Sequence, residues 1–278
     1  MEYITAMKNK FIKMHGLGND FAIFDARSKK IPMSLKTIRK LSDRHTGIGF
    51  DQLIVLEKPK RKGADAFMRI YNKDGSEVGA CGNATRCVGK LLIKEKKKKT
   101  VTIDTRAARL SAAMKGEKLT VDMGPVNLGW QQIPLMQEED TLAVPVDAGP
   151  LQSAVAVNVG NPHAVFFMDS VEDFALTRYG PKVENDPIFP EKTNVEIASV
   201  TGKNKIRMRV WERGAGITRA CGTGACAVAV AGFRKGLTGR KVAVELDGGI
   251  LDIEWRASDN HVLMTGAVAE VYRGEVDL

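Results

Sequence analysis

The chain has 278 residues, 44% of them hydrophobic, and a formal net charge of +9. This length suits one large domain or two of ordinary size, with enough apolar residues for real cores. Aromatic residues are only 6%, and much of the positive charge lies in the Lys-rich runs 58–62 and 94–99, so we expect no nucleic-acid partner.

The first half of the chain predicts a mainly β domain. The stretch FIKMHGLGNDFAIFDA (11–26) predicts two strands around a glycine-containing turn. Ser34 is suited to cap a helix that carries Leu35, Ile38 and Leu41 on one face and ends near Arg44. A strand within TGIGFDQLIVLEK comes next, and the stretch TVTIDTRAARLSAAMKGEKLTVDMGP predicts antiparallel strands joined by Lys-Gly turns.

Two stretches, 68–95 and 208–236, share one pattern. Each predicts a strand of alternating character, a glycine-bearing loop, the tripeptide Ala-Cys-Gly and then a helix. Cys81 and Cys221 therefore occupy the same place, at a helix entrance. The helix dipole there is expected to lower the pKa of a thiol, and the free backbone N–H groups suit an anion. Cys87 and Cys226 fall inside the helices, where we expect them to serve packing.

The second half of the chain repeats the order of the first. Gly160 follows Gly18 at the same interval at which Asn194 follows Gln52, and the interval between the two helix-entrance cysteines differs from it only slightly. A register held this closely over half the chain predicts two homologous domains, 1–125 and 126–266. We expect the closing segment 267–278 to return to the first domain.

Two thiols in matching halves suggest acid–base chemistry on one carboxylate-bearing substrate. A thiolate on one face of an amino acid can take the α-hydrogen while a thiol on the other face returns a proton, which inverts the centre. Helix N-termini would stabilise the developing enediolate. The cysteine spacings are not those of zinc or redox motifs, and we expect neither a metal nor a cofactor.

Polar residues near the turns are candidates for holding the rest of the substrate. Uncharged amides can hold ammonium and carboxylate ends alike, and these candidates are Asn19, Gln52, Asn72, Asn83, Asn161 and Asn194. Arg213 can grip a second carboxylate in bidentate fashion. His163 and Glu212 are candidates for tuning the pKa of a thiol.

The motifs HGLGNDF, DGSEVGACGNATRCV, GNPHAV, TNVE and WERGAGITRACGTGACA resemble the signature set of the diaminopimelate epimerases. The resemblance implies an α+β fold of two similar pseudo-symmetric domains, each a mainly antiparallel, β-barrel-like sheet around a central helix, with the active site between them. It also implies pyridoxal-phosphate-independent interconversion of LL- and meso-diaminopimelate, an isomerase reaction of lysine and peptidoglycan precursor synthesis.

By motif position, the resemblance implies roles for individual residues. The acid–base pair would be Cys81 and Cys221, with His163 and Glu212 as the thiol-tuning residues. The implied substrate contacts are Asn19, Gln52, Asn72, Gly82, Asn83, Asn161, Asn194, Glu212, Arg213, Gly222 and Thr223. The chain departs from the family pattern at Ala84, where glycine is common, and at Ile217, where glutamate is usual. Neither change removes a proton-transfer group.

Two other functions remain open from the sequence. A proline or hydroxyproline racemase would share the duplicated fold, but its substrate would leave Arg213 and several asparagines without a role. A redox-sensing protein would instead join Cys81 and Cys221 in a reversible disulfide. The sequence leaves the oligomeric state open, and a homodimer is possible.

We expect a soluble cytoplasmic protein that does not bind a membrane. No apolar run approaches the roughly eighteen residues that cross a bilayer, and the N-terminus lacks the apolar centre of a signal peptide. Without export, the four cysteines are expected to be reduced.

Overall fold

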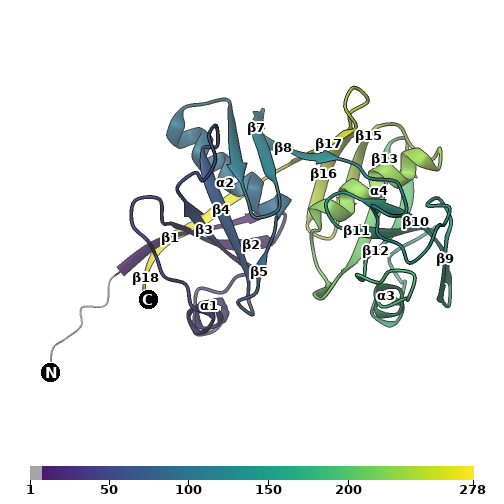
Figure 1. Cartoon of the computed structure of the whole chain (residues 1–278), viewed down its shortest axis with the longest axis horizontal. Helices are drawn as coiled ribbons and strands as arrows, with labels where there is room; N and C mark the ends of the chain where they lie inside the picture. The colour runs from purple at the N-terminus through teal and green to yellow at the C-terminus, as the bar shows by residue number, and fades with distance from the viewer. Residues whose placement is uncertain (1–7) are drawn as a thin grey trace. The chain divides into compact units, whose positions relative to one another are not determined.

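The computed structural model describes residues 8–278 (Figure 1). The chain divides into two compact units. Unit 1 consists of the residues up to Val121 together with Ala267–Leu278, and unit 2 of Asp122–Gly266. Each unit is mainly β structure with one long and one shorter helix, so the predicted α+β class is confirmed. Among the described residues, no helix is long and apolar enough to span a bilayer.

Unit 1 contains two helices and a sheet of mixed direction. Its elements are β1 (Lys8–Gly16), β2 (Asn19–Asp25), α1 (Leu35–Ser42), β3 (Gln52–Glu57), β4 (Ala66–Asn72), β5 (Glu77–Val78), α2 (Gly82–Lys96), β6 (Thr100–Asp104), β7 (Arg109–Lys115), the start of β8 (Lys118–Pro125) and β18 (Ala269–Asp277). The strand order is β18-β1-β2-β3-β4-β6-β7. The pairs β2–β3 and β4–β6 are parallel, and the others are antiparallel.

Unit 2 repeats this plan. Its elements are the end of β8, then β9 (Val144–Ala148), β10 (Leu151–Asn158), β11 (Pro162–Phe167), α3 (Leu176–Glu184), β12 (Asn194–Gly202), β13 (Lys205–Glu212), β14 (Gly216–Ile217), α4 (Gly222–Arg234), β15 (Lys241–Leu246), β16 (Gly249–Trp255) and β17 (His261–Gly266). The strand order is β9-β10-β11-β12-β13-β15-β16-β17, with β11–β12 and β13–β15 parallel.

The repeat seen in the sequence is also a repeat of strand register. In unit 1, Phe21 on β2 lies opposite Gln52 on the parallel strand β3. In unit 2, His163 on β11 lies opposite Asn194 on the parallel strand β12. His163 follows Phe21 at the same interval at which Asn194 follows Gln52. Equivalent residues therefore occupy equivalent places in the two sheets.

Strand β18 gives unit 1 the place that β9 fills in unit 2. Strand β9 precedes β10 in the chain and pairs with it in antiparallel fashion. The equivalent place beside β1 is taken by β18, whose residues Ala269–Asp277 run antiparallel to β1. The last strand of the chain thus completes the sheet that the first strand begins.

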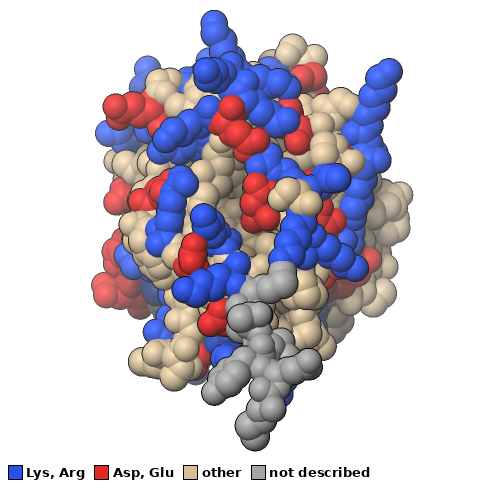
Figure 2. Space-filling view, turned by 90° about the vertical axis from the view of Figure 1, so that its left-hand side faces the viewer, with Lys and Arg blue, Asp and Glu red and all other residues tan. Residues whose placement is uncertain are grey.

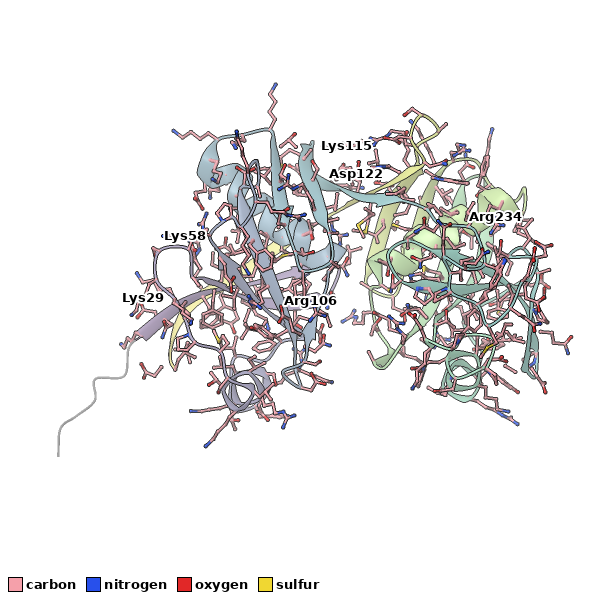
Figure 3. The ribbon with its side chains drawn as sticks, viewed as in Figure 1. Lys29, Lys58, Arg106, Lys115, Asp122 and Arg234 are labelled. Atoms are coloured by element: carbon pink, nitrogen blue, oxygen red, sulfur yellow. The ribbon has the colours of Figure 1, made fainter. Side chains whose placement is uncertain are left out.

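Each long helix is largely buried against the strands of its unit, and the sequence of α4 is apolar or small on nearly all sides. Helix α4 is GTGACAVAVAGFR; nearly all of it is buried, and it contacts strands β10 to β13 and β15 to β17. A helix that is apolar all round belongs inside a fold. At its C-terminal end Arg234, marked in Figure 3, donates to Thr141 Oγ1 at 2.8 Å. Helix α2 packs against β1, β6 and β7.

The short helix α1 begins as predicted. The Ser34 side chain caps it by accepting a hydrogen bond from the Thr37 backbone N–H at 3.0 Å. Ile38 and Leu41 are buried, whereas Leu35, the first residue of the helix, is 58% exposed. Its side chain lies against Gly75, where an added Cβ would come within 2.6 Å of Leu35 Cδ2.

The positive charge is concentrated in unit 1. Residues 1–121 and 267–278 contain 28 Lys and Arg against 15 Asp and Glu, and residues 122–266 contain 14 against 18. These give +13 and −4, which sum to the formal net charge of +9. Lys and Arg side chains cover much of the face drawn in Figure 2, with Asp and Glu among them. Some of this charge is balanced locally, since Asp104 pairs with both Arg61 and Arg109.

The pairing of β18 with β1 in unit 1 can be tested at Gly274, which packs closely on Phe11. A Cβ placed on Gly274 would lie 2.7 Å from the Phe11 ring, and that ring is buried. Gly274→Val should therefore lower the free energy of unfolding of unit 1 by about 1–3 kcal/mol, as overpacking does. Urea unfolding measures the loss, and amide hydrogen exchange should place it in β1.

The neighbouring exposed variant Glu275→Val is the control, and it should change stability by less than about 0.5 kcal/mol. Equal losses for the two variants would show that β18 is not packed on β1 in the manner described.

Candidate active site

Both predicted helix-entrance cysteines are N-cap residues. Cys81 precedes α2, and its Sγ accepts a hydrogen bond from the Ala84 backbone N–H at 3.5 Å. Cys221 precedes α4, and its Sγ accepts from the Gly224 N–H at 3.4 Å. Each sulfur takes the role that a Ser or Asp oxygen plays at most helix starts. The prediction of paired helix entrances is confirmed.

The other two cysteines lie inside the helices, as predicted. Cys87 and Cys226 are fully buried. Burial raises the pKa of the Cys87 thiol to about 12, so this thiol stays protonated at neutral pH. Cys81 is half-buried, whereas Cys221 is only 4% exposed.

In unit 1, predicted amide residues form two hydrogen-bonded pairs. Asn83, the second residue of α2, donates from Nδ2 to Asn19 Oδ1 at 3.1 Å. Asn19 in turn donates from its own Nδ2 to Asp51 Oδ2 at 3.1 Å. On the neighbouring strands, Gln52 Nε2 donates to Asn72 Oδ1 at 3.0 Å. The Asp51 carboxylate therefore orients the Asn19 amide, and Asn19 orients Asn83.

An ion network holds the start of β2, where Asn19 lies. Lys13 Nζ lies 2.7 Å from Asp20 Oδ2, and both side chains are largely buried. Arg44 donates to Asp20 and to Asp51. Burial by itself would raise the pKa of Asp20, but hydrogen bonds from Arg44 and Lys13 outweigh it and hold the pKa well below its usual range. Asp20 is therefore charged in the folded protein.

In unit 2, predicted residues meet on β11 to β13 and the loop that follows. His163 Nε2 lies 3.0 Å from Asn161 Oδ1. Asn194 is buried; its Nδ2 donates to the Pro162 carbonyl at 2.9 Å, and its Oδ1 accepts from the Arg213 backbone N–H at 3.0 Å. The Arg213 guanidinium is exposed and donates to the Glu191 carbonyl at 2.8 Å.

Glu212 stands beside Cys221. It is half-buried at the end of β13 and accepts a hydrogen bond from the Thr218 hydroxyl. Burial raises the pKa of Glu212, and the nearby Glu196 carboxylate acts in the same direction. Hydrogen bonds from Thr218 and Cys221 oppose this rise. Glu212 and Cys221 therefore share one electrostatic environment.

The expected lowering of the Cys221 pKa is wrong for the structure described. Burial raises the pKa of this thiol well above its ordinary value, and the carboxylates of Glu212 and Glu196 raise it further. Hydrogen bonds from Thr223 and the Gly224 N–H lower it, but by less. The helix dipole is therefore outweighed by desolvation and by two neighbouring carboxylates.

Sequence reasoning missed Glu196. This residue lies on β12, is fully buried, and its Oε1 lies 2.7 Å from His163 Nδ1. Its counterpart in the first half of the chain is Ile54, so a search for matched polar pairs passes over it. Its place inside the TNVE motif, two positions after Asn194 on the same strand face, is a signal that would have found it.

The structure thus divides the predicted residues between the two units. Unit 1 holds Asn19, Gln52, Asn72, Cys81, Gly82 and Asn83. Unit 2 holds Asn161, His163, Asn194, Glu212, Arg213, Cys221, Gly222 and Thr223. Gly82 and Gly222 are the first residues of α2 and α4. Substrate contact by each of these residues remains a prediction.

The fold of the chain is shared with solved racemase and epimerase structures. It is similar to a probable proline racemase from Agrobacterium radiobacter, with a TM-score of 0.67, 16% identity, and coverage of 97% of this chain and 93% of the other. It is also similar to a predicted epimerase from Pseudomonas aeruginosa, with a TM-score of 0.66, 18% identity, and coverage of 96% and 99%. These likenesses establish the fold shared by such racemases and epimerases.

Sequence comparison gives the particular family. The model of the family described as diaminopimelate epimerase matches residues 11–129 and 155–271. The diaminopimelate epimerase of Rhodospirillum centenum is 54% identical, over 97% of this chain and 93% of its own length. That of Erythrobacter litoralis is 52% identical, over 98% of both chains. The chain belongs to the diaminopimelate epimerase family, and the predicted resemblance is confirmed.

The ion network predicts how acid acts on unit 1. The pKa of Asp20 is lower in the folded than in the unfolded chain. The Asp20 carboxylate therefore stabilises the folded protein fully above its unfolded pKa of about 4, and this stabilisation is lost as pH falls from there toward the lower folded pKa. Asp20→Asn should lower the free energy of unfolding at pH 7 by about 3–5 kcal/mol, because it leaves the buried Lys13 ammonium without its counterion and with the neutral Gly49 carbonyl as a buried acceptor. Urea unfolding between pH 7 and pH 3 measures both effects, and the variant should show a flatter acid slope.

Asp25→Asn is the matched control at the other end of β2, where the carboxylate is about half exposed. It should cost less than about 1 kcal/mol. An Asp20→Asn chain with the acid slope of the parent would mean that another carboxylate carries the dependence.

Proposed function

We propose that this chain is an isomerase that interconverts LL- and meso-diaminopimelate by a two-cysteine, cofactor-independent mechanism. The observation that carries the proposal is the pair of cysteine N-caps in a chain of the diaminopimelate epimerase family. The substrate follows from the names of relatives that are 52–54% identical over nearly the whole chain. The alternative, a proline racemase, is supported only by a solved structure that is 16% identical to this chain.

The proposed reaction moves one proton in and one proton out. The thiolate of one cysteine forms an S–H bond with the α-hydrogen, and the C–H electron pair passes into the carboxylate as an enediolate. The enediolate collapses, and its electron pair takes the proton of the opposite thiol on the other face. The centre is inverted, and the two sulfurs have exchanged protonation states. The proposal requires one substrate to reach Cys81 and Cys221 together.

The helix N-termini supply the electrostatic part of this mechanism. An α-hydrogen is far less acidic than a thiol, so the enediolate needs stabilisation that water does not give. The first turns of α2 and α4 have backbone N–H groups without helical partners, and each helix begins with a glycine, Gly82 or Gly222, which has no side chain to keep a ligand from those groups. Such donors stabilise negative charge on a carboxylate by about 3 kcal/mol each where water is excluded.

The surroundings of Cys221 suit a proton donor. Its raised pKa favours the thiol form in the resting protein. After the proton leaves, the thiolate is held by the Gly224 N–H and lies 3.5 Å from the Thr223 hydroxyl. The proposal therefore includes a resting state in which Cys221 carries a proton. The proposal also includes a cytoplasmic location, because both thiols must stay reduced. The proposed substrate gives the chain a role in lysine and peptidoglycan precursor synthesis.

The two-thiol mechanism predicts where solvent deuterium appears. The enzyme is run in deuterated water from pure LL-substrate and stopped early, and both pools are examined by mass spectrometry. The product should carry deuterium at the inverted centre, while recovered substrate stays almost unlabelled, because the abstracting thiolate begins empty and the donating thiol begins deuterated. Label entering recovered substrate as fast as product would contradict the assignment.

Single substitutions test the same assignment. Cys81→Ala and Cys221→Ala should each reduce kcat for inversion by at least about 10³-fold, since each removes the group on one face. Cys87→Ala is the matched control from inside α2 and should keep inversion within about tenfold. A Cys81→Ala or Cys221→Ala chain as active as Cys87→Ala would refute the mechanism.

Arg213 is expected to bind the distal carboxylate. Its guanidinium is exposed and is held by one hydrogen bond to a backbone carbonyl, which leaves donors free for a bidentate pair. Arg213→Met should lower kcat/KM roughly 30-fold to several thousand-fold, which corresponds to a loss of about 2–5 kcal/mol in transition-state stabilisation. Steady-state kinetics measure this loss. Arg178→Met, on the exposed side of α3, is the control, and a loss below tenfold at Arg213 would assign that side chain elsewhere.

A further inference from the structure

A fully buried hydrogen-bonded pair, His163 and Glu196, lies beside Cys221. Glu196 Oε1 on β12 lies 2.7 Å from His163 Nδ1 on the parallel strand β11, and neither side chain has solvent exposure. The other ring nitrogen, Nε2, faces Asn161 Oδ1 at 3.0 Å. Each ring nitrogen therefore faces a side-chain oxygen. The pair is therefore held firmly and is oriented from two directions.

The second oxygen of Glu196 makes no hydrogen bond. Oε2 is buried, and it has no hydrogen-bond partner within residues 8–278. A buried carboxylate oxygen without a donor is costly and needs a reason. The Glu196 carboxylate contacts the first turn of α4, where partly unsatisfied N–H groups give positive potential. The helix start offsets part of the cost of burying this charge.

Gly224 makes that approach possible. A Cβ placed on Gly224 would lie 2.7 Å from Glu196 Oε1 and 3.3 Å from Cys221 Sγ. A side chain at this position would push the carboxylate away. The Glu196 carboxylate, from β12, and the Cys221 sulfur therefore both lie against the first turn of α4, and they compete for its positive potential.

The groups that act on the Cys221 thiol come from three elements. Glu212 from β13 and Glu196 from β12 each raise the pKa of the thiol, and Thr223 and the Gly224 N–H at the start of α4 lower it. His163 from β11 lies against Glu196. A thiolate at Cys221 would thus be a third anion beside two carboxylates.

The equivalent positions of unit 1 lack these ionisable groups. Phe21, Ile54 and Ala84 stand where unit 2 has His163, Glu196 and Gly224, at the intervals that relate the other paired positions of the repeat. Phe21, Ile54 and Ala84 are fully buried, so those places are packed with apolar atoms. The charged cluster is therefore an addition to the common fold, made only at the second thiol.

We propose that Glu196 is a positioning residue that keeps Cys221 loaded with its proton and holds His163 in place. The inference rests on the proposed function, because a proton-loaded Cys221 matters only if this thiol exchanges a proton with substrate. Glu196 does not itself touch the reacting atoms. It makes the proton affinity of Cys221 differ from that of Cys81, so that Cys221 is the proton donor in the resting enzyme.

The test follows the protonation of Cys221 directly. The full chain is labelled with carbon-13 at the cysteine β-carbons, and the Cys221 signal is identified by its loss in Cys221→Ala. In Glu196→Gln, the midpoint of the Cys221 titration should move to lower pH by about one unit or more, which is tenfold in thiolate at a given pH. The pH profile of kcat/KM should move in the same direction, and Glu196→Asp should restore part of both shifts.

Glu184→Gln is the matched control, since Glu184 is another buried glutamate of unit 2, hydrogen-bonded to Trp211 and Gly214. It should leave the Cys221 midpoint unchanged. Gly224→Ala is the second variant, because it displaces Glu196 without removing charge, and it should lower the midpoint as well.

An unchanged Cys221 midpoint in Glu196→Gln or in Gly224→Ala would overturn the inference, whatever the activity. A shifted midpoint together with full activity of Cys221→Ala would leave the Glu196 effect in place and would instead overturn the proposed mechanism.

Discussion

The use of a cysteine sulfur as the N-cap of a buried helix is the constraint on which the site depends. Helices α2 and α4 are surrounded by strands, so their first N–H groups can be satisfied only by the chain itself or by a ligand. Each sulfur accepts one of these N–H groups, at Ala84 and at Gly224. The strand-to-helix turn that places the sulfur also brings the polar ends of the neighbouring strands close to it.

The two units keep this geometry and differ in its chemistry. In unit 1 the predicted groups fixed near the start of α2 are the amides of Asn19 and Asn83, which the Asp51 carboxylate orients. Around Cys221 they are carboxylates and an imidazole. A duplicated scaffold can place two reactive groups in the same geometry while their different surroundings shift their pKa values apart. A reaction that takes a proton from one side and supplies one from the other suits that inequality.

Much of the fold was open to prediction because its signals are local or periodic. The capping of α1 by Ser34, the strands around the Gly18 turn and the helix starts at both cysteines depend on a few adjacent residues. Leu35 shows the limit of such reasoning. It has the helical spacing of a core residue, yet the first turn of a short helix lies at the edge of its core and leaves the side chain exposed.

The sequence by itself determined the duplication, the helix entrances and the identity of the paired polar positions, since a nearly constant offset between matching motifs needs no structure to be seen. Only the tertiary structure decided the electrostatics. The dipole of α4 favours a thiolate, but burial and two carboxylates, one of them on β12, reverse that preference. Desolvation and charge proximity depend on which strands pack together, and Glu196 has no polar counterpart in the first half of the chain to reveal it.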